Sequence, residues 1–597
     1  MRRHRWRIRL ALLGLAPVLG GSAAWGKGVQ PRVEKLDNGL ELLLVERHEQ
    51  PIAAGCVVYD VGSVNDPRGQ SGIAHLFEHM LFKGSTIIGT TDYENEKKLI
   101  DEEEKLRVQM NDEMNKMREM KRHGKINDVL DPAQWTPQYT AMKKKFDGLV
   151  ESHRPFVKNN ELFNLYTNNG GAGLNAGTSA DFTIYFVQLP SNKIELFFWL
   201  ESDRMSNGIM REFYVERDNV REERRLRTES TPTGKLDEAF EALFWQSHPY
   251  GIPTLGWASE VESITSQDVR DFYRIYYAPN NAKVVLVGDF DSNKVVDLAK
   301  RYFGRIPRGT IPPAPIITEE PRPVAERRLE GEAETNPQVT VRFHTVAMGH
   351  TDEAALDVAA QLLSGKTGRL YKRLVTKEEA AIGQPTASND SRKYAGSLEI
   401  NATVKEGRET ELVEKLIVEE IEKLRDEEIT DYELQKVKNQ VLAQSVQRLR
   451  SNTGLMFQLA IYDLWYDWTY INEAPELMMK VTADEVRRVI KSYLDPKTRT
   501  VAVYRTKAGA ASKELDDPEL TAALAGVPAE VQAQIKQQLA RIKESADPEK
   551  LQSGIQRLEQ VAAAGQVPEE QKGIMNLMMK AMRSRLTELE GAKKETK

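Results

Sequence analysis

Two histidines and a glutamate lie close together in the segment His75-Leu76-Phe77-Glu78-His79. On a helix, residues three and four positions apart share one face, so both imidazoles can bind one metal ion with the Glu78 carboxylate beside them. Zinc favours imidazole nitrogen and lowers the pKa of a bound water toward about 7. Glu78 can then accept the proton of that water and pass it to a leaving amine. The spacing therefore predicts a site for metal-assisted hydrolysis, and the plain alternative is a pair of ordinary surface or core histidines.

A catalytic zinc usually has three protein ligands and one open position. The chain has a single cysteine, Cys56, in an apolar strand-like run that favours burial in the core, so a carboxylate is the natural third ligand. The charged segment 216–225 offers one, because Glu216 and Glu223 are two helical turns apart on one face. Taken alone, this segment is also typical of a solvated charged helix.

The two segments together resemble the pitrilysin/insulinase family of inverzincin zinc metallopeptidases, in the small two-lobed branch that includes mitochondrial processing peptidase. That family combines H-x-x-E-H with E-R-x5-E on a later helix, and this chain has Glu216-Arg217 followed by Glu223. Glu222 is out of register with the motif. The resemblance implies one zinc ion per chain, with His75, His79 and Glu223 as its ligands. It also implies that Glu78 is the general base and that Glu216 is a supporting catalytic carboxylate.

The resemblance extends over roughly residues 32–506. Asn175 and Ala176 match the start of the strand beside the active site and are assigned to substrate binding on that ground. The family implies a zinc endopeptidase or oligopeptidase that hydrolyses extended peptides or unfolded protein. One alternative is a catalytically inactive scaffold or partner subunit of the same fold, which the family also contains. Another is a metal-storage or metal-sensing module, which would bind metal without turnover that depends on Glu78.

Two features depart from the family pattern. The separation between His79 and Glu223 is about twice the usual one, and the charged helical segment 92–160 accounts for the excess. Val375 and Ile382 stand where members that act alone often carry an Arg and a Tyr that hold the substrate. The second departure leads us to expect a hetero-partner of the same family that supplies the pair. The alternative is a monomer or homodimer in which other donors, such as Lys372 or Arg373, replace it.

The elements that must position these residues are of mixed type, and we expect an α+β fold. Short β-rich runs alternate with helical periodicities on both sides of a Pro-rich segment. A motif that begins at Thr265 recurs at Thr482, at a constant offset through the following Tyr, Pro and strand, which indicates two related lobes. The expected organisation is a catalytic zinc-binding lobe at 32–308, with a helical-hairpin insertion at 92–160 that forms a solvated arm, a linker at 309–323, an inert second lobe at 324–506 and a helical C-terminal extension at 507–597.

The N-terminus has the pattern of a targeting segment. Five arginines precede a short apolar run, and small residues follow near position 24, which predicts a cleaved signal peptide at 1–24. The apolar run is shorter than the roughly 20 residues that cross a bilayer, so we expect a periplasmic or secreted protein with no transmembrane segment after cleavage. A formal net charge of −6 argues against a nucleic-acid-binding function.

Overall fold

The computed structural model describes residues 28–507 and, in the C-terminal extension, residues 535, 538–539, 542, 551–555, 558 and 569–595. The expected signal peptide, 1–24, lies outside the described residues. The chain divides into two compact units, Met1–Thr506 and Lys507–Lys597. In the second unit the described residues after Lys507 are helical and include α20 (Glu569–Glu595). Among the described helices, none is both long and apolar enough to cross a membrane.

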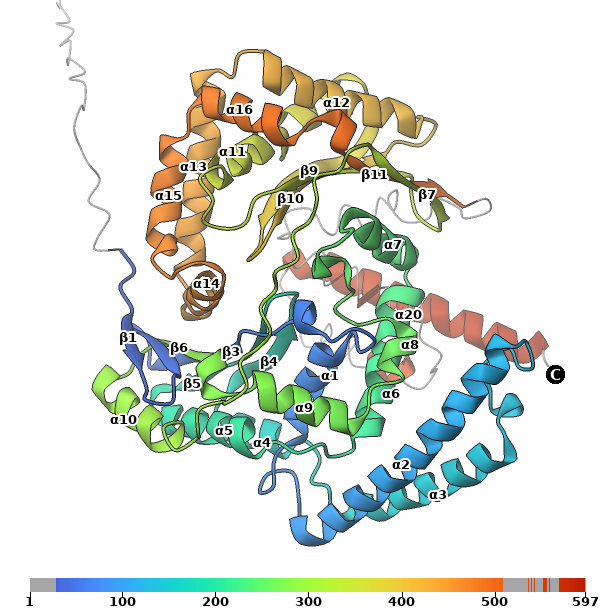
Figure 1. Cartoon of the computed structure of the whole chain (residues 1–597). Helices are drawn as coiled ribbons and strands as arrows, with labels where there is room; N and C mark the ends of the chain where they lie inside the picture. The colour runs from blue at the N-terminus through green and yellow to red at the C-terminus, as the bar shows by residue number, and fades with distance from the viewer. Residues whose placement is uncertain are drawn as a thin grey trace, which may run out of the picture. The chain divides into compact units, whose positions relative to one another are not determined.

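The first lobe is built on a six-stranded mixed sheet with the order β1-β2-β6-β3-β5-β4 (Figure 1). Its strands are β1 (Arg32–Lys35), β2 (Glu41–Glu46), β3 (Ile52–Tyr59), β4 (Ala172–Thr178), β5 (Thr183–Pro190) and β6 (Ala282–Gly288). Its helices are α1 (Ile73–Met80), α2 (Tyr93–Arg122), α3 (Pro137–His153), α4 (Glu161–Thr167), α5 (Ile194–Asn207), α6 (Phe213–Arg224), α7 (Gly234–Phe244), α8 (Ala258–Val261), α9 (Ser266–Tyr276) and α10 (Ser292–Tyr302). Strand β4 is an edge strand, which matters for the site below.

The second lobe repeats this plan with a five-stranded sheet in the order β7-β11-β8-β10-β9. Its strands are β7 (Arg327–Ala333), β8 (Gln338–Thr345), β9 (Ala381–Ser391), β10 (Gly396–Val404) and β11 (Thr500–Thr506). Its helices are α11 (Glu353–Leu363), α12 (Thr410–Asp426), α13 (Asp431–Arg448), α14 (Asn452–Trp465), α15 (Tyr470–Lys480) and α16 (Ala483–Tyr493). The expected α+β class with two related lobes is confirmed.

The sequence repeat corresponds to equivalent helices in the two lobes. Helices α9 and α16 both begin with a capping box, in which Thr265 pairs with Asp268 and Thr482 pairs with Glu485. Each helix is followed by a buried strand of its sheet, β6 and β11 respectively. A capping box satisfies two backbone N–H groups at a helix start, so the same short motif starts the same element twice.

Each lobe covers one face of the other lobe's sheet with a helix. From the second lobe, α14 packs on β3 and β6 through a buried apolar cluster that includes Leu455, Leu459 and Val285. From the first lobe, α7 packs on β7 and β11, with Phe240 against Ala502 and Tyr504. Strand β3 is therefore buried on both faces, and Cys56 is fully buried within it, as its apolar surroundings predict. Each lobe thus keeps its own core, and two further apolar clusters join the lobes.

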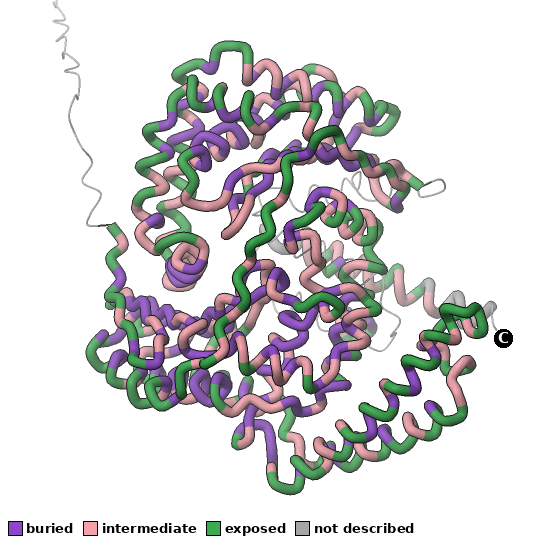
Figure 2. The backbone as a smooth tube through the Cα atoms, viewed as in Figure 1, coloured by how far each residue is buried: buried purple, intermediate pink, exposed green. Residues whose placement is uncertain are grey.

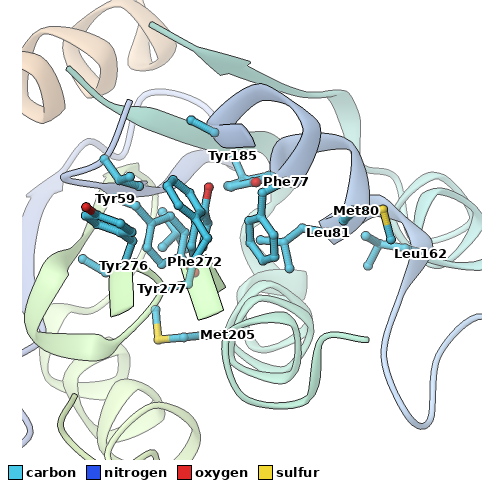
Figure 3. Close-up of a cluster of buried hydrophobic side chains, with 14 of the residues drawn as sticks. Tyr59, Phe77, Met80, Leu81, Leu162, Tyr185, Met205, Phe272, Tyr276 and Tyr277 are labelled. Carbon is cyan, nitrogen blue, oxygen red and sulfur yellow. The ribbon is translucent and has the colours of Figure 1, made fainter. Parts of the chain in front are cut away.

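Helix α1, which carries the H-x-x-E-H segment, is anchored at its start and along its inner face. The carboxylate of Asp66 accepts hydrogen bonds from the backbone N–H groups of Gly72 and Ala74, at 2.6 and 3.1 Å. Gly72 has φ 88°, a conformation that glycine adopts without a side-chain penalty. The inner face of α1 packs into the aromatic cluster of Figure 3, where the Phe77 and Tyr277 ring centroids are 4.2 Å apart. Both features fix the helix on the sheet.

Helices α2 and α3 form the inserted hairpin and lie side by side, extending away from the first sheet (Figure 1). Buried and exposed residues alternate along both helices, because a narrow apolar stripe faces the partner helix (Figure 2). The stripe includes Met110, Met117, Tyr139 and Phe146, and it is continuous with the core of the first lobe. This continuity differs from the solvated arm that the charged composition predicts.

The structure departs most from the expected solvated arm at the base of the hairpin, where charged groups are buried. Arg211 is fully buried; its Nη2 lies 3.0 Å from the Glu96 carboxylate, and its guanidinium also donates to the carbonyls of Lys83, Ser85 and Ile88. His153 bridges Glu96 and Glu103, at 3.0 and 3.1 Å. Burial lowers the pKa of His153, but the two carboxylates outweigh it and raise that pKa to about 9. The hairpin base is therefore tied to the segment that follows α1.

Replacing Arg211 by alanine is expected to lower the free energy of unfolding by about 3–5 kcal/mol, because the Glu96 carboxylate would remain buried without its cation. The matched control is Arg122→Ala at the exposed tip of the hairpin, which should change stability by less than about 0.5 kcal/mol. Urea denaturation followed by circular dichroism measures both. Equal stability of the two variants would show that the buried cluster does not hold the hairpin.

Candidate functional site

Helices α1 and α6 bring the predicted ligands together from segments far apart in the chain. His75 and His79 lie one turn apart on α1, and Glu223 lies near the end of α6. The Glu223 Oε2 atom is 3.8 Å from His75 Nε2 and 3.2 Å from His79 Nε2. Among the described residues, these three side chains form the group whose ligand atoms all lie within 4.8 Å of one another. The geometry leaves their donor atoms around a common point.

This donor set fits zinc. Two imidazole nitrogens and one carboxylate oxygen are ligands that zinc takes in catalytic sites, with a fourth position left open. Burial lowers the pKa of His75 to about 4, so this imidazole is neutral at physiological pH and is ready to ligate. The His75 Nδ1 atom is also buried and has no hydrogen-bond partner among the described residues. The site thus presents ligands and charge that suit a divalent cation.

Glu216 lies behind His79 and fixes its orientation. The Glu216 Oε2 atom is 3.6 Å from His79 Nδ1, on the side of the ring away from Glu223. Burial lowers the pKa of His79, but Glu216 and Glu223 outweigh it and raise that pKa to about 9. Lys83 in turn pairs with Glu216 at 3.3 Å and with Glu212 at 2.5 Å. Carboxylates in this position set the tautomer and basicity of a metal-ligating histidine.

Glu78 is directed toward the edge of the sheet and does not join the ligand group. It accepts a 2.6 Å hydrogen bond from the hydroxyl of Thr178, the last residue of β4. Burial raises the pKa of Glu78, and the Thr178 hydrogen bond partly offsets that rise. A carboxylate with a raised pKa, held next to a metal site, is suited to accept and release a proton.

The structure separates the two adjacent glutamates of α6. Glu223 lies beside the histidines and its Oε1 atom pairs with Arg227 at 2.9 Å. Glu222 is exposed on the far side of the helix and pairs with Arg225 at 2.6 Å. Of the two, only Glu223 has an oxygen directed at the imidazoles.

Comparison with known proteins gives two family matches along the chain. Residues 42–114 match the family described as Insulinase (Peptidase family M16), and residues 263–441 match the one described as Peptidase M16 inactive domain. The chain belongs to peptidase family M16. The first match contains α1 and ends inside α2, within the helical insertion, and the second covers most of the second lobe.

Two relatives from M16 resemble the chain over 82% and 49% of its length. The "Zinc protease PqqE" of Helicobacter pylori is 26% identical over 503 residues, which are 82% of this chain and 97% of that relative. Mitochondrial-processing peptidase subunit beta of Saccharomyces cerevisiae is 22% identical over 323 residues, which are 49% of this chain and 66% of the relative. Relatives named zinc proteases support a peptidase function at the level of the family.

Solved structures agree on the fold. A protease from Helicobacter pylori has a TM-score of 0.65 at 24% identity, covering 80% of this chain and 99% of that chain. An M16-like peptidase from Alicyclobacillus acidocaldarius has a TM-score of 0.62 at 16% identity, covering 80% of this chain and 98% of that chain. At these identities the comparison shows the two-lobed M16 fold.

The M16 site opens into a cavity of about 330 Å³ beside Glu78 and His79. Asn175 lines this cavity from edge strand β4. Ala176 is instead paired with Tyr185 of β5 and packs against the core of the first lobe. Residues 157–162, which follow the hairpin, line the opposite part of the cavity. The insertion therefore contributes to the surroundings of the site, although its tip lies outside them.

In the second lobe, Val375 lies on the π-helical turn Tyr371–Lys377, and Ile382 lies at the start of β9. Val375 packs against the apolar core of that lobe. Arg373, a candidate replacement donor, is engaged by Glu419 at 2.9 Å and by Glu378 at 3.1 Å. Lys372 is exposed. This part of the M16 second lobe therefore presents no free guanidinium to a substrate.

Several residues that organise the site were given no role by the sequence motifs. Thr178 orients Glu78, Lys83 with Glu212 holds Glu216, and Arg227 holds one oxygen of Glu223. Arg227 could have been found from its helical i, i+4 spacing to Glu223. Thr178 and Glu212 carry no such signal, because their partners are distant in sequence and meet only in the folded lobe.

Replacing Glu223 by glutamine is expected to reduce zinc content strongly, because a neutral amide replaces the anionic ligand. The control is Glu222→Gln, which removes the neighbouring exposed carboxylate and should leave zinc content unchanged. Elemental analysis of the purified proteins measures both. A fully zinc-loaded Glu223 variant would contradict this assignment.

Replacing Glu216 by glutamine is expected to weaken zinc binding by about 10-fold to 100-fold, while the ligand set stays complete. The reason is that His79 loses the carboxylate that orients its ring. Competition with a chromophoric chelator measures the affinity, and Glu195→Gln on the exposed surface of α5 is the control. An affinity equal to that of the control would remove Glu216 from the site.

Proposed function

We propose that the chain is a zinc-dependent endopeptidase or oligopeptidase that hydrolyses extended peptides. The observation that carries this proposal is the convergence of His75, His79 and Glu223 around one point, with Glu78 beside them but outside the ligand group. A storage or sensing site does not require a half-buried carboxylate held in that position. The assignment of one zinc ion per chain rests on the same geometry.

The free edge of β4 is the surface on which a peptide would bind. Strand β4 ends the sheet, and its outer N–H and C=O groups have no partner strand among the described residues. An extended peptide can add to such an edge through backbone hydrogen bonds. Because Thr178 of this strand contacts Glu78, a peptide added here would pass the candidate metal site. Antiparallel addition is the commoner pairing, so it is the direction we propose.

The side chains have distinct roles in this proposal. A bound zinc ion would supply a Lewis acid and a water of lowered pKa. Glu78 accepts a proton from the attacking water and delivers it to the leaving amine, and Thr178 holds the carboxylate in place. Glu216 keeps His79 in the orientation that ligation needs. The apolar packing under α1 keeps Glu78 half-buried, which sustains its raised pKa.

The rival proposal is an inactive scaffold or partner subunit of the same fold. The side chains of Val375 and Ile382 have no hydrogen-bond donors, which favours this inactive-subunit proposal. The same lack would also fit an active chain that receives an Arg/Tyr pair from a second M16 subunit. The complete set of ligands and the position of Glu78 argue for an active chain. A homodimer, or donors elsewhere in the chain, remain alternatives to a hetero-partner.

We also propose export, on the basis of the N-terminal pattern at 1–24. One relative of known structure is described as the periplasmic protease PqqL from Escherichia coli, and its structure covers 82% of this chain with a TM-score of 0.59. Retention of a tagged chain in the cytoplasmic fraction of the native cell would contradict export.

Replacing Glu78 by glutamine is expected to retain zinc and to lower turnover of unstructured peptides by about 10²-fold to 10⁴-fold, because the proton acceptor is lost. Zinc content and hydrolysis of a quenched fluorescent peptide are measured on the same preparation. Glu222→Gln serves as the control with normal turnover. Near-normal cleavage by the zinc-loaded Glu78 variant would refute the role.

A further inference from the structure

A second cavity, of about 450 Å³, lies between the two lobes where β4 ends. Residues 179–182, which follow β4 directly, form one wall, and the segment 250–254 of the first lobe forms another. The second lobe contributes Ile461 and Trp465 of α14 and Arg392 of the turn between β9 and β10. Thr178 donates a hydrogen bond to Glu78, the proposed general base, and the next residue, Ser179, already lines this cavity. The first cavity, lined by Asn175, adjoins β4 on the other side of Thr178.

Much of the lining of this cavity is apolar and comes from both lobes. Phe182 of the first lobe and Trp465 of the second lobe have ring centroids 6.2 Å apart. Ile252, Pro253 and Ile461 are half-buried beside them. A half-buried apolar surface of this kind gains free energy when a further apolar side chain covers it.

Arg392 provides hydrogen-bond donors at the same cavity. Its Nε–H donates to Asp390 at 2.7 Å, and its guanidinium lies 5.1 Å from the centroid of the Tyr250 ring. Among the described residues, no acceptor bonds to its Nη1 or Nη2 atoms. An arginine has five N–H donors in a planar fork, so four N–H groups of this cavity-lining side chain have no acceptor in the described part of the chain.

The acidic side chains that line the cavity are already engaged. Glu238 pairs with Arg224 at 2.7 Å, and Glu241 pairs with Arg342 at 2.6 Å. The Asp181 carboxylate accepts from the Tyr250 hydroxyl at 2.9 Å. Each of these acids therefore has a donor of its own. Within the part of the chain that the structure describes, unpartnered donors at this cavity belong to Arg392 and to the buried indole Nε1–H of Trp465.

The turn that carries Arg392 is held against the first lobe. The next residue, Lys393, pairs with Asp60 at 2.5 Å, and the backbone N–H of Tyr394 donates to the Tyr250 hydroxyl at 3.2 Å. These contacts fix the turn, and the bond to Asp390 holds the guanidinium of Arg392, before any ligand arrives. A preorganised donor loses less conformational entropy on binding than a mobile one.

We propose that this cavity is a substrate subsite. It takes an apolar side chain on the N-terminal side of the scissile bond, while Arg392 donates to a backbone carbonyl of the same peptide segment. The inference rests on the proposed peptidase function and names the substrate class: peptides with a large apolar residue N-terminal to the cleaved bond. The N-terminal side is assigned from antiparallel addition to β4, in which a peptide runs from the Thr178 end toward the Ala172 end. The residues that precede the cleaved bond then lie at the Thr178 end, where this cavity is. The second lobe thereby supplies a positioning donor from a place other than Val375 and Ile382.

Binding is tested apart from turnover, in the zinc-loaded Glu78→Gln protein, by fluorescence anisotropy of a labelled unstructured peptide that contains Leu and Phe. Adding Arg392→Ala should weaken the affinity by about 10-fold to 100-fold, since hydrogen bonds from a charged donor are lost. Arg392→Lys, which keeps the charge but not the planar fork, should give a smaller loss. The control is Lys415→Ala, which removes an exposed cation of the same lobe and should leave the affinity unchanged.

Specificity is tested with Glu78 intact, by mapping the cleavage sites of a mixed peptide library. Ile461→Glu places a charge in the apolar wall and should lower the preference for Leu or Phe over Lys on the N-terminal side by about tenfold or more. Melting temperature and zinc content of each variant show that it is folded and loaded.

The outcomes separate the two proposals. Unchanged affinity in Arg392→Ala, or unchanged preference in Ile461→Glu, overturns the subsite, even if the chain cleaves peptides. A changed preference on the C-terminal side overturns the assigned direction. Peptide binding that depends on Arg392, without any hydrolysis by the parent chain, supports the subsite and contradicts the peptidase function instead.

Discussion

The packing of α1 against α6 is the contact on which the candidate site depends. Helix α1 contributes both imidazoles and Glu78, and α6 contributes Glu216 and Glu223, so a small shift between the helices would separate the donor atoms. Two buried arginines anchor α6 at two positions along its length. Arg217 donates to the carbonyl of Ile264, and Arg224 donates to the carbonyl of Gly256. Lys83, just beyond α1, pairs with two glutamates of the α6 segment. The ligands are therefore held by backbone anchors and ion pairs that belong to the fold.

The same physical device recurs where the insertion joins the lobe. Arg211 is buried against backbone carbonyls and Glu96, and it ties the segment after α1 to the first turn of α2. Arg107 of α2 stacks on Tyr214 of α6, at 4.2 Å from the ring centroid. Buried arginines lose hydration, and fixed acceptors or an aromatic ring face offset part of that loss. These clusters hold the hairpin base in a fixed relation to the helices of the site.

The second lobe has two roles in this structure. It completes the fold, since α14 covers the face of the first sheet that would otherwise leave β3 and β6 exposed. It also brings polar groups to the space beside β4, where Lys393 bonds Asp60. Under the proposed subsite, this lobe without a metal motif would take part in substrate recognition, and much of it matches a domain described as inactive.

The sequence predicted the site where local spacing carried the information. The i, i+3, i+4 pattern at His75 and the seven-residue spacing at Glu216 gave the faces of α1 and α6, and the turn and repeat signals gave the two lobes. Contacts between distant segments had no such signal. Which surfaces meet in the fold decides three features: the hydrogen bond from Thr178 to Glu78, the unpartnered donors of Arg392 and the burial of Glu96. The charged composition of the hairpin suggested solvation because ion pairs that become buried look the same in sequence as those that stay exposed.

We propose that two histidines and one glutamate hold a single zinc ion. The most direct measurement is anomalous X-ray diffraction at the zinc edge, on crystals of the protein purified without added metal. We expect one peak per chain, at about 2.0–2.2 Å from His75 Nε2, His79 Nε2 and a Glu223 oxygen. A peak ligated by Glu222 or Glu216 in place of Glu223, or no zinc peak from a folded protein supplied with zinc, would contradict it.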